Sequence, residues 1–142
     1  CGLACRDTLR LEAGMPLYGH ELSRDVTPAQ AGLAGVVVNA KESFVGKDHA
    51  VGVKSSRVLV GLSAEGKRAP RAEYPVLDQE GTVIGEITSG ALSPTLGFPI
   101  AMAYVEAAHR EVGTELVVDV RGASLPVTVT SLPFYSRKKV TS

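Results

Sequence analysis

The second half of the chain alternates apolar and polar positions with the period of two that is typical of β-strands. Within residues 113–122, one face is apolar and carries Leu116, Val118 and Val120. Residues 125–133 repeat this alternation, with a leucine and valines on one face and threonines on the other. The pattern therefore predicts two neighbouring strands that bury one face and expose the other.

Further strands are predicted upstream by the same alternation and by turn residues. Residues 57–66 place valines and a leucine on one face, and residues 100–106 form another apolar segment. Residues 74–90 are typical of a hairpin with its turn at residues 78–81. Closely spaced strands separated by glycines favour a small antiparallel β-barrel or a two-sheet Greek-key domain. The expected fold is therefore mainly β, with this domain over residues 44–142.

The first part of the chain carries helical patterns instead, and we expect residues 1–43 to form a short helical segment that precedes the barrel domain. A threonine followed by a proline favours the start of a short helix over residues 27–35. Consecutive valines predict a strand over residues 36–39, and a short helix is favoured over residues 44–53.

The most highly charged stretch lies in a predicted helix over residues 2–13. Glu12 continues an apolar stripe of this helix, so we expect its carboxylate near the core, where it needs a cation or several hydrogen-bond donors. Asp7 is placed to pair with Arg10, whereas Arg6 has no acidic residue three or four positions later. Two interpretations of Arg6 stay open: a solvated surface side chain, or a guanidinium that binds a planar or carboxylate ligand.

The composition argues against several classes of function. Lysine plus arginine and aspartate plus glutamate both number 15, and this balance disfavours a general nucleic-acid-binding protein. No segment approaches the roughly 18 apolar residues of a membrane span. Cys1 and Cys5 do not make a tetrahedral metal set, and the histidines are too scattered for a metal site. We expect reduced, partly buried thiols in a cytoplasmic protein. Because the chain begins inside a predicted helix and without methionine, we also expect a fragment.

Several motifs together resemble the C-terminal portion of the aminomethyltransferases, the T-protein of the glycine cleavage system. The longest are GLACRDTLRLEAGMPLYGHEL at residues 2–22 and GEITSGALSPTLGFPIAMAYV at residues 85–105. RVLVGL, PRAEYPV, GTELVVDVRG and LPFYSRK follow the family order as well. Within these motifs, RDTLRLEAG and ITSGALSPTLG are the most specific. The resemblance covers essentially the whole chain.

The resemblance implies that residues 1–43 are the end of a folate-binding domain. The family protein is longer, and its N-terminal part carries most of the pterin pocket and the catalytic aspartate. No catalytic residue is therefore assigned in this chain. The arginine of the family's ARD motif contacts folate, which implies this role for Arg6. The family's tail supplies a further folate contact, which implies Arg137, Lys138 or Lys139, with a frayed basic tail as the alternative.

The resemblance also implies a reaction. A lipoylated carrier, the glycine cleavage H-protein, delivers an aminomethyl group on its lipoyl arm, and N5 of tetrahydrofolate attacks the methylene carbon. Ammonia leaves, 5,10-methylenetetrahydrofolate forms, and no metal is needed. The fragment alone is expected to be inactive. Two other classes stay open: a non-catalytic docking module, and a folate-dependent demethylase or sarcosine-type one-carbon enzyme.

We also expect one loop and one arginine to lie near other parts of the family protein or its carrier. Residues 89–97 are expected to form a structural loop between strands, with a second role at the entrance for the lipoyl arm as the alternative. Arg71 precedes a predicted strand and is expected to hold the barrel to the absent part of the family protein through ion pairs.

Overall fold

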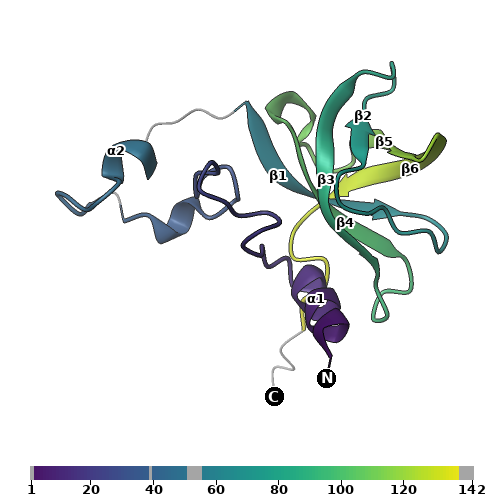
Figure 1. The fold of residues 1–142 in the computed structure, drawn as a ribbon, viewed down its shortest axis with the longest axis horizontal. Helices are drawn as coiled ribbons and strands as arrows, with labels where there is room; N and C mark the ends of the chain where they lie inside the picture. The colour runs from purple at the N-terminus through teal and green to yellow at the C-terminus, as the bar shows by residue number, and fades with distance from the viewer. Residues whose placement is uncertain (1, 39, 51–55, 138–142) are drawn as a thin grey trace.

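The computed structural model describes residues 2–38, 40–50 and 56–137. Within these ranges, the main body is a closed antiparallel barrel with the strand order β1-β4-β3-β2-β5-β6 (Figure 1). The strands are β1 (Arg57–Ala64), β2 (Pro75–Leu77), β3 (Val83–Leu92), β4 (Pro99–Glu106), β5 (Glu115–Val120) and β6 (Ala123–Thr130). The predicted mainly β fold is confirmed, and closure decides between the two predicted architectures in favour of the barrel.

The alternation along the strands builds the core of the barrel. In β5, the predicted inward face is buried, and Leu116, Val118 and Val120 are each at most 3% exposed. The interior is completed by apolar residues of the other strands, including Val60, Leu62, Val76, Ile84, Ile87, Ala103, Val105, Val127 and Val129. The barrel therefore encloses a hydrophobic core made from its own strands.

Two glycines allow the close approach of neighbouring segments on β3. A Cβ atom at Gly85 would collide with the carbonyl oxygen of Tyr104 in β4. A Cβ atom at Gly90 would collide with the carbonyl oxygen of Pro70, in the loop that follows β1. Because Gly90 has no side chain, this loop lies directly against β3.

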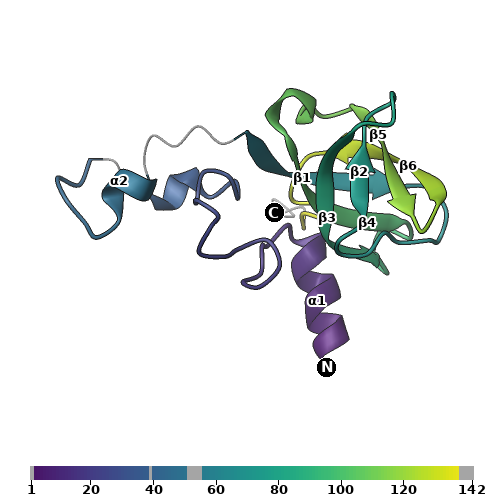
Figure 2. The same cartoon turned by 45° about the horizontal axis from the view of Figure 1, so that its top comes forward.

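Helix α1 (Leu3–Glu12) confirms the predicted first helix and packs on the outside of the barrel through its last turn. Leu11 is fully buried against Ile100 and Met102 of β4. Leu9, in contrast, is 56% exposed. Figures 1 and 2 both show the start of the helix pointing away from the barrel.

The expected partial burial of the thiols is wrong for Cys5, which is exposed as a free cysteine. The physical reason is the packing of α1, which buries Arg10, Leu11 and Glu12 and leaves its earlier turns in solvent. Cys1 lies outside the described residues.

Residues 27–35 do not form the predicted helix. The capping hydrogen bonds of a helix start do form. The Thr27 N–H donates to the side-chain oxygen of Gln30, and the Gln30 N–H donates to the hydroxyl oxygen of Thr27. The turn then ends at Gly32, whose φ of +72° is incompatible with a continuing helix. A short 3-10 helix, η1 (Ala34–Val36), follows.

The predicted strand over residues 36–39 is also wrong. Val36 belongs to η1, and within the described part of the chain no strand pairs with this segment; Asn39 lies outside that part. The short helix predicted over residues 44–53 is confirmed as α2 (Lys47–Ala50), while residues 51–53 lie outside the described residues. Figures 1 and 2 show η1 and α2 extending away from the barrel. No described helix has the length and apolar character needed to cross a membrane.

Candidate functional site

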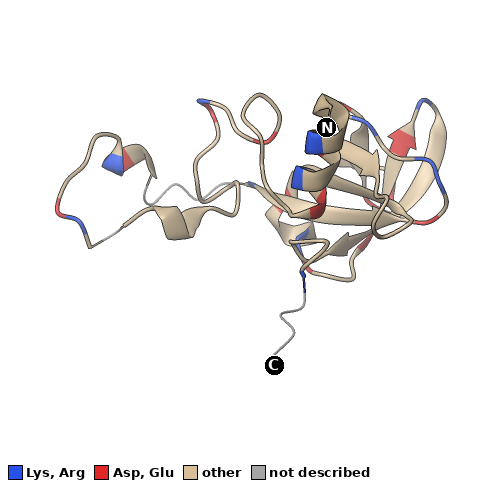
Figure 3. Ribbon diagram, turned by 90° about the horizontal axis from the view of Figure 1, so that it is seen from below, with Lys and Arg blue, Asp and Glu red and all other residues tan. Residues whose placement is uncertain are grey.

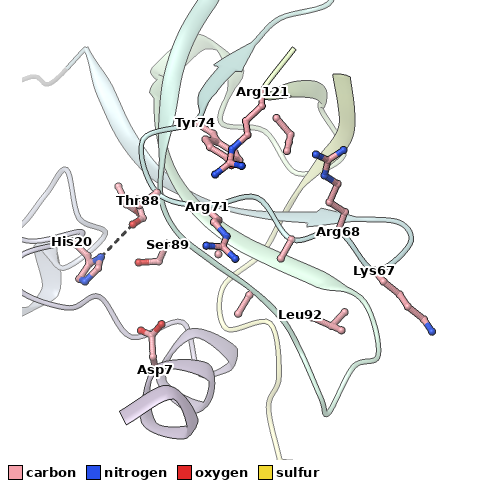
Figure 4. Close-up of a pocket in the computed structure, with 15 residues that line it drawn as sticks. Asp7, His20, Lys67, Arg68, Arg71, Tyr74, Thr88, Ser89, Leu92 and Arg121 are labelled. Carbon is pink, nitrogen blue, oxygen red and sulfur yellow. Dashed lines mark hydrogen bonds between the residues drawn. The ribbon is translucent and has the colours of Figure 1, made fainter. Parts of the chain in front are cut away.

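A groove of about 740 Å³ lies between β3 and the loop that follows β1 (Figure 4). Residues 88–92 of β3 form one side, and loop residues 67–69, 71 and 72 form the other. Arg121, at the turn between β5 and β6, and Asp7 of α1 lie at opposite ends of the view. The groove therefore joins segments that are far apart in the sequence.

The lining of this groove is positively charged. Its exposed basic residues are Lys67, Arg68, Arg71 and Arg121. Three of the four lie in the loop after β1, and Figure 3 shows basic positions in blue on the loops of the barrel. Asp7 is the one acidic residue of the lining, and its carboxylate already pairs with Arg10 at 2.6 Å. None of the four basic residues forms an ion pair with another described residue. Such a lining suits carboxylate or phosphate groups of a partner.

A buried ion pair holds α1 beside the groove. Arg10 Nη1 donates to Glu21 Oε2 at 2.7 Å, and the side chains are 9% and 0% exposed. Arg10 also donates to the Asp7 carboxylate and the Ser89 hydroxyl, both at 2.8 Å. A buried charge is tolerated when it is paired and hydrogen-bonded, and no buried side-chain nitrogen or oxygen among the described residues lacks a partner.

A β-bulge in β3 brings two consecutive hydroxyls to this ion pair. The register of β3 against β4 shifts between Ile87 and Ser89, so Thr88 has no direct partner on β4. Neighbouring side chains of a regular strand point to opposite faces. Here Thr88 Oγ1 donates to Glu21 Oε1 at 2.8 Å, while Ser89 Oγ accepts from Arg10.

The charge state of Glu21 follows from these contacts. Its donors are the hydroxyls of Ser89 and Thr88 and the backbone N–H of Leu17. Burial opposes the charged form, but these donors and the paired guanidinium hold the pKa of Glu21 below its ordinary value. Burial and the Glu21 charge raise the pKa of Tyr104 to about 12. Both groups therefore keep one protonation state near neutral pH, which suits structural roles rather than proton transfer.

Glu12 forms a second buried carboxylate cluster at the end of α1. It is 3% exposed and accepts from Ser93 Oγ at 2.5 Å, Thr95 Oγ1 at 2.8 Å and the Thr95 N–H at 3.1 Å. Burial opposes the charged form, but these hydrogen bonds hold the pKa of Glu12 below its ordinary value. The prediction that Glu12 approaches the core and needs several donors is confirmed. Ser93 and Thr95, in the loop between β3 and β4, supply those donors, whereas residues 89–92 of the expected loop belong to β3.

Arg6, the predicted folate contact on α1, lies one turn before Arg10 and is exposed. Its side chain has no ion pair with another described residue. The predicted pairing of Asp7 with Arg10 is confirmed, so Asp7 is engaged elsewhere. The guanidinium of Arg6 therefore has no acidic partner among the described residues.

The tail residues are only partly described. Arg137 is exposed, and Lys138 and Lys139 lie outside the described residues. The tail reaches the opposite end of α1 from Arg6, where the Tyr135 N–H donates to the carbonyl oxygen of Glu12 at 2.9 Å. The structure therefore brings the tail to α1, but it joins Arg6 and Arg137 by no contact among the described residues.

Sequence reasoning missed the role of Glu21 and the groove. Helix spacing finds partners three or four residues away, whereas Arg10 and Glu21 are separated by a loop. Arg71 was expected to form ion pairs with an absent part, and the structure places it in the groove wall. A cluster of basic residues at 67, 68 and 71 was the available signal for the groove.

Both parts of the chain match known protein families. A family model described as the glycine cleavage T-protein C-terminal barrel domain matches residues 57–136, and a GCVT N-terminal domain model matches residues 1–41. These matches place the closed barrel in the class of T-protein C-terminal barrels. Individual proteins agree: an aminomethyltransferase of Streptomyces avermitilis is 62% identical across 98% of this chain, and one of Cutibacterium acnes is 60% identical across 96%. The chain belongs to the glycine cleavage T-protein family.

A solved structure gives the same result for the fold. The glycine cleavage system aminomethyltransferase T from Bartonella henselae superposes with a TM-score of 0.87 at 39% identity, over 94% of this chain. The chain spans 39% of that protein and 39% of the Streptomyces avermitilis relative. Both similarities therefore concern a part of a longer protein.

Proposed function

We propose that this chain is the C-terminal part of a tetrahydrofolate-dependent aminomethyltransferase of the glycine cleavage system. One observation carries the proposal: the segments that match the two family models pack together as one structural unit. Helix α1 lies in the N-terminal match and is joined to the barrel of the C-terminal match by the Arg10–Ser89 hydrogen bond and the Glu12 cluster, while the Thr88 hydroxyl of β3 donates to Glu21, the ion-pair partner of Arg10. In this arrangement, Arg6 is exposed on the part of α1 that points away from the barrel, where the N-terminal part of the protein could contact it.

In this proposal, residues 1–43 are the end of the folate-binding domain and residues 44–142 form the C-terminal barrel domain. Arg6 contacts tetrahydrofolate, and Arg137 or Lys139 of the tail supplies a second contact. A guanidinium stays protonated, so Arg6 orients and neutralises the ligand rather than moving protons. The exposed free thiol of Cys5 fits the reducing cytoplasm as the location.

The proposed reaction takes the aminomethyl group from the lipoyl arm of a carrier, the H-protein. N5 and N10 of tetrahydrofolate each form a bond to the methylene carbon, while its bonds to nitrogen and to the lipoyl sulfur break, so that ammonia and the reduced lipoyl group leave. The basic groove is proposed to dock the carrier through acidic side chains. Its support is the set of four exposed cations without ion pairs among the described residues.

The activity is tested on the intact protein, meaning this chain together with the N-terminal part that its relatives have. Ammonia release is measured with aminomethylated carrier and tetrahydrofolate, and tetrahydrofolate binding is measured by calorimetric titration. We expect turnover and saturable binding by the intact protein, and no turnover by the 142-residue chain alone. Carrier binding without ammonia release would contradict the proposal and favour a docking module. Methyl transfer from another amine would favour a demethylase.

The carrier site is tested by the charge reversals Lys67→Glu and Arg71→Glu. We expect a higher KM for the carrier and an unchanged Kd for tetrahydrofolate. An exposed cation away from the groove, Lys41, provides the matched control as Lys41→Glu. Equal effects of all three reversals would show a general charge effect and remove the groove from the carrier site.

A further inference from the structure

Helix α1 is held at one end. Arg10, Leu11 and Glu12 in its last turn are buried, whereas the part that carries Arg6 is exposed and points away from the barrel (Figure 2). A ten-residue helix is about 15 Å long and moves largely as one piece. The contacts of the last turn therefore set the direction in which Arg6 is presented.

We propose that Arg10 is a positioning residue for the folate site. Its guanidinium fixes the angle of α1 on the barrel and so places Arg6 against its ligand. This inference rests on the proposed function, in which Arg6 contacts tetrahydrofolate. Arg10 itself is buried, so no direct contact with the ligand is assigned to it.

The contacts of Arg10 explain why an arginine stands here. Its three side-chain acceptors come from three different segments: Asp7 from α1, Glu21 from the loop after α1, and Ser89 from the bulge of β3. The donors of a guanidinium lie in one rigid plane, so three acceptors define its orientation. A lysine carries the same charge on a single rotatable nitrogen. Lysine at position 10 would keep an ion pair and lose the fixed plane.

Stability alone is a weak reason for such a pair. A buried ion pair often contributes no more to stability than apolar residues of the same volume. The end of α1 is already held by the burial of Leu11 and by the Glu12 cluster. What the Arg10 contacts add is a unique geometry, because each of them is directional and two of them join α1 to other segments, namely Glu21 in the loop after α1 and Ser89 in β3. This directionality is the property that a positioning role requires.

The test is a double-mutant cycle in the intact protein, read as the Kd for tetrahydrofolate. We expect Arg6→Ala to raise Kd roughly 10- to 100-fold, as for a lost charge-assisted hydrogen bond. We expect Arg10→Lys to raise Kd about three- to tenfold when Arg6 is present, and less than about twofold in the Arg6→Ala background. The KM for tetrahydrofolate should rise in parallel, while the KM for the carrier stays unchanged.

Equal effects of Arg10→Lys in both backgrounds would overturn the inference, since Arg10 would then act independently of Arg6. An Arg6→Ala variant with unchanged Kd would overturn it as well. Failure of the proposed function is seen earlier and separately, in a wild-type protein that does not bind tetrahydrofolate.

Two further variants complete the test, one as an alternative to Arg10→Lys and one as a control. If Arg10→Lys does not fold, Ser89→Ala removes a single acceptor of the guanidinium and should raise Kd about two- to threefold, again only with Arg6 present. If Ser89→Ala has the same effect in both backgrounds, the inference fails. Arg24→Lys is the matched control, because Arg24 is exposed and forms no ion pair with a described residue. We expect Arg24→Lys to bind tetrahydrofolate like the wild type.

Discussion

The barrel and the N-terminal segment differ in where they place their apolar residues. The strands β1 to β6 direct apolar side chains into a closed interior, where most of these side chains are nearly inaccessible to solvent. The segment before the barrel leaves large apolar side chains in solvent, including Leu3, Leu9, Met15, Val36, Val38 and Val45. Such side chains are available to pack against another part of a longer protein. The difference teaches that the barrel supplies its own core, whereas residues 1–41, which match an N-terminal domain model, leave large apolar side chains exposed, as expected for the proposed end of a larger domain.

The largest expected effect separates the two regions directly. Leu62→Ala removes a side chain that is 1% exposed inside the barrel, and we expect the free energy of unfolding of the 142-residue chain to fall by about 2–5 kcal/mol. Leu9→Ala removes the same atoms from a side chain that is 56% exposed, and we expect a change within about 0.5 kcal/mol. Urea denaturation of both variants gives these values.

The same pair sharpens the comparison in the intact protein. There, Leu9→Ala should become more destabilising than it is in the 142-residue chain, because the rest of the N-terminal domain would cover Leu9. A destabilisation that stays equally small in both proteins would show that Leu9 faces solvent in the intact protein as well.

The second prediction concerns the joint between the two regions. Glu12→Gln replaces a buried carboxylate that three hydrogen bonds from the loop after β3 stabilise, and we expect a loss of about 1–3 kcal/mol. Glu111→Gln, at an exposed glutamate, is the matched control and should change stability little. Equal losses in both variants would remove the Glu12 cluster from the joint.

The pH dependence of stability tests the same joint. Folding lowers the pKa values of Glu12 and Glu21, so their contribution is fully present above the unfolded value of roughly 4.3 and is lost as the pH falls through the folded values. Thermal unfolding should therefore shift to lower temperature in acid. Glu12→Gln should flatten this acid limb, whereas Glu111→Gln should leave it as steep as in the wild type.

A third prediction places a smaller effect at the turn that ends α1. Gly14 has a φ of +67°, and a Cβ atom there would lie 3.1 Å from Pro133 in the tail. We expect Gly14→Ala to cost about 1–2 kcal/mol, because the left-handed backbone and the contact with the tail both oppose a side chain. Gly19→Ala has a similar φ of +91° without a neighbour within 4 Å, and should cost less. Equal costs in urea denaturation would exclude a contribution from the tail contact.

How far the sequence predicts this molecule also divides along the two regions. The strands could be predicted because alternation with a period of two is a local signal that survives folding, as Leu116, Val118 and Val120 show. The helix over residues 27–35 and the strand over residues 36–39 could not, since local propensity there is overruled by Gly32 and by the absence of a pairing strand in the described part.

The site shows the same limit. Spacing along a helix predicts the pairing of Asp7 with Arg10, and the position of Glu12 predicts its burial. The Arg10–Glu21 pair depends on a loop conformation and on the bulge at Thr88, neither of which has a periodic signal. Contacts between distant segments therefore had to come from the structure, and these contacts carry the positioning role proposed for Arg10.

The smallest expected effect concerns Arg121, a residue whose backbone conformation lowers the stability of the barrel. Arg121 begins the tight turn between β5 and β6 with a φ of +56°, a conformation that asparagine and glycine adopt more readily than arginine. Arg121→Asn should therefore raise the free energy of unfolding by roughly 0.5–1 kcal/mol. Because Arg121 also lines the basic groove, the same change should raise the KM for the carrier while the Kd for tetrahydrofolate stays constant. A variant that is more stable and docks the carrier as well as the wild type would show that the strained arginine does not serve the groove.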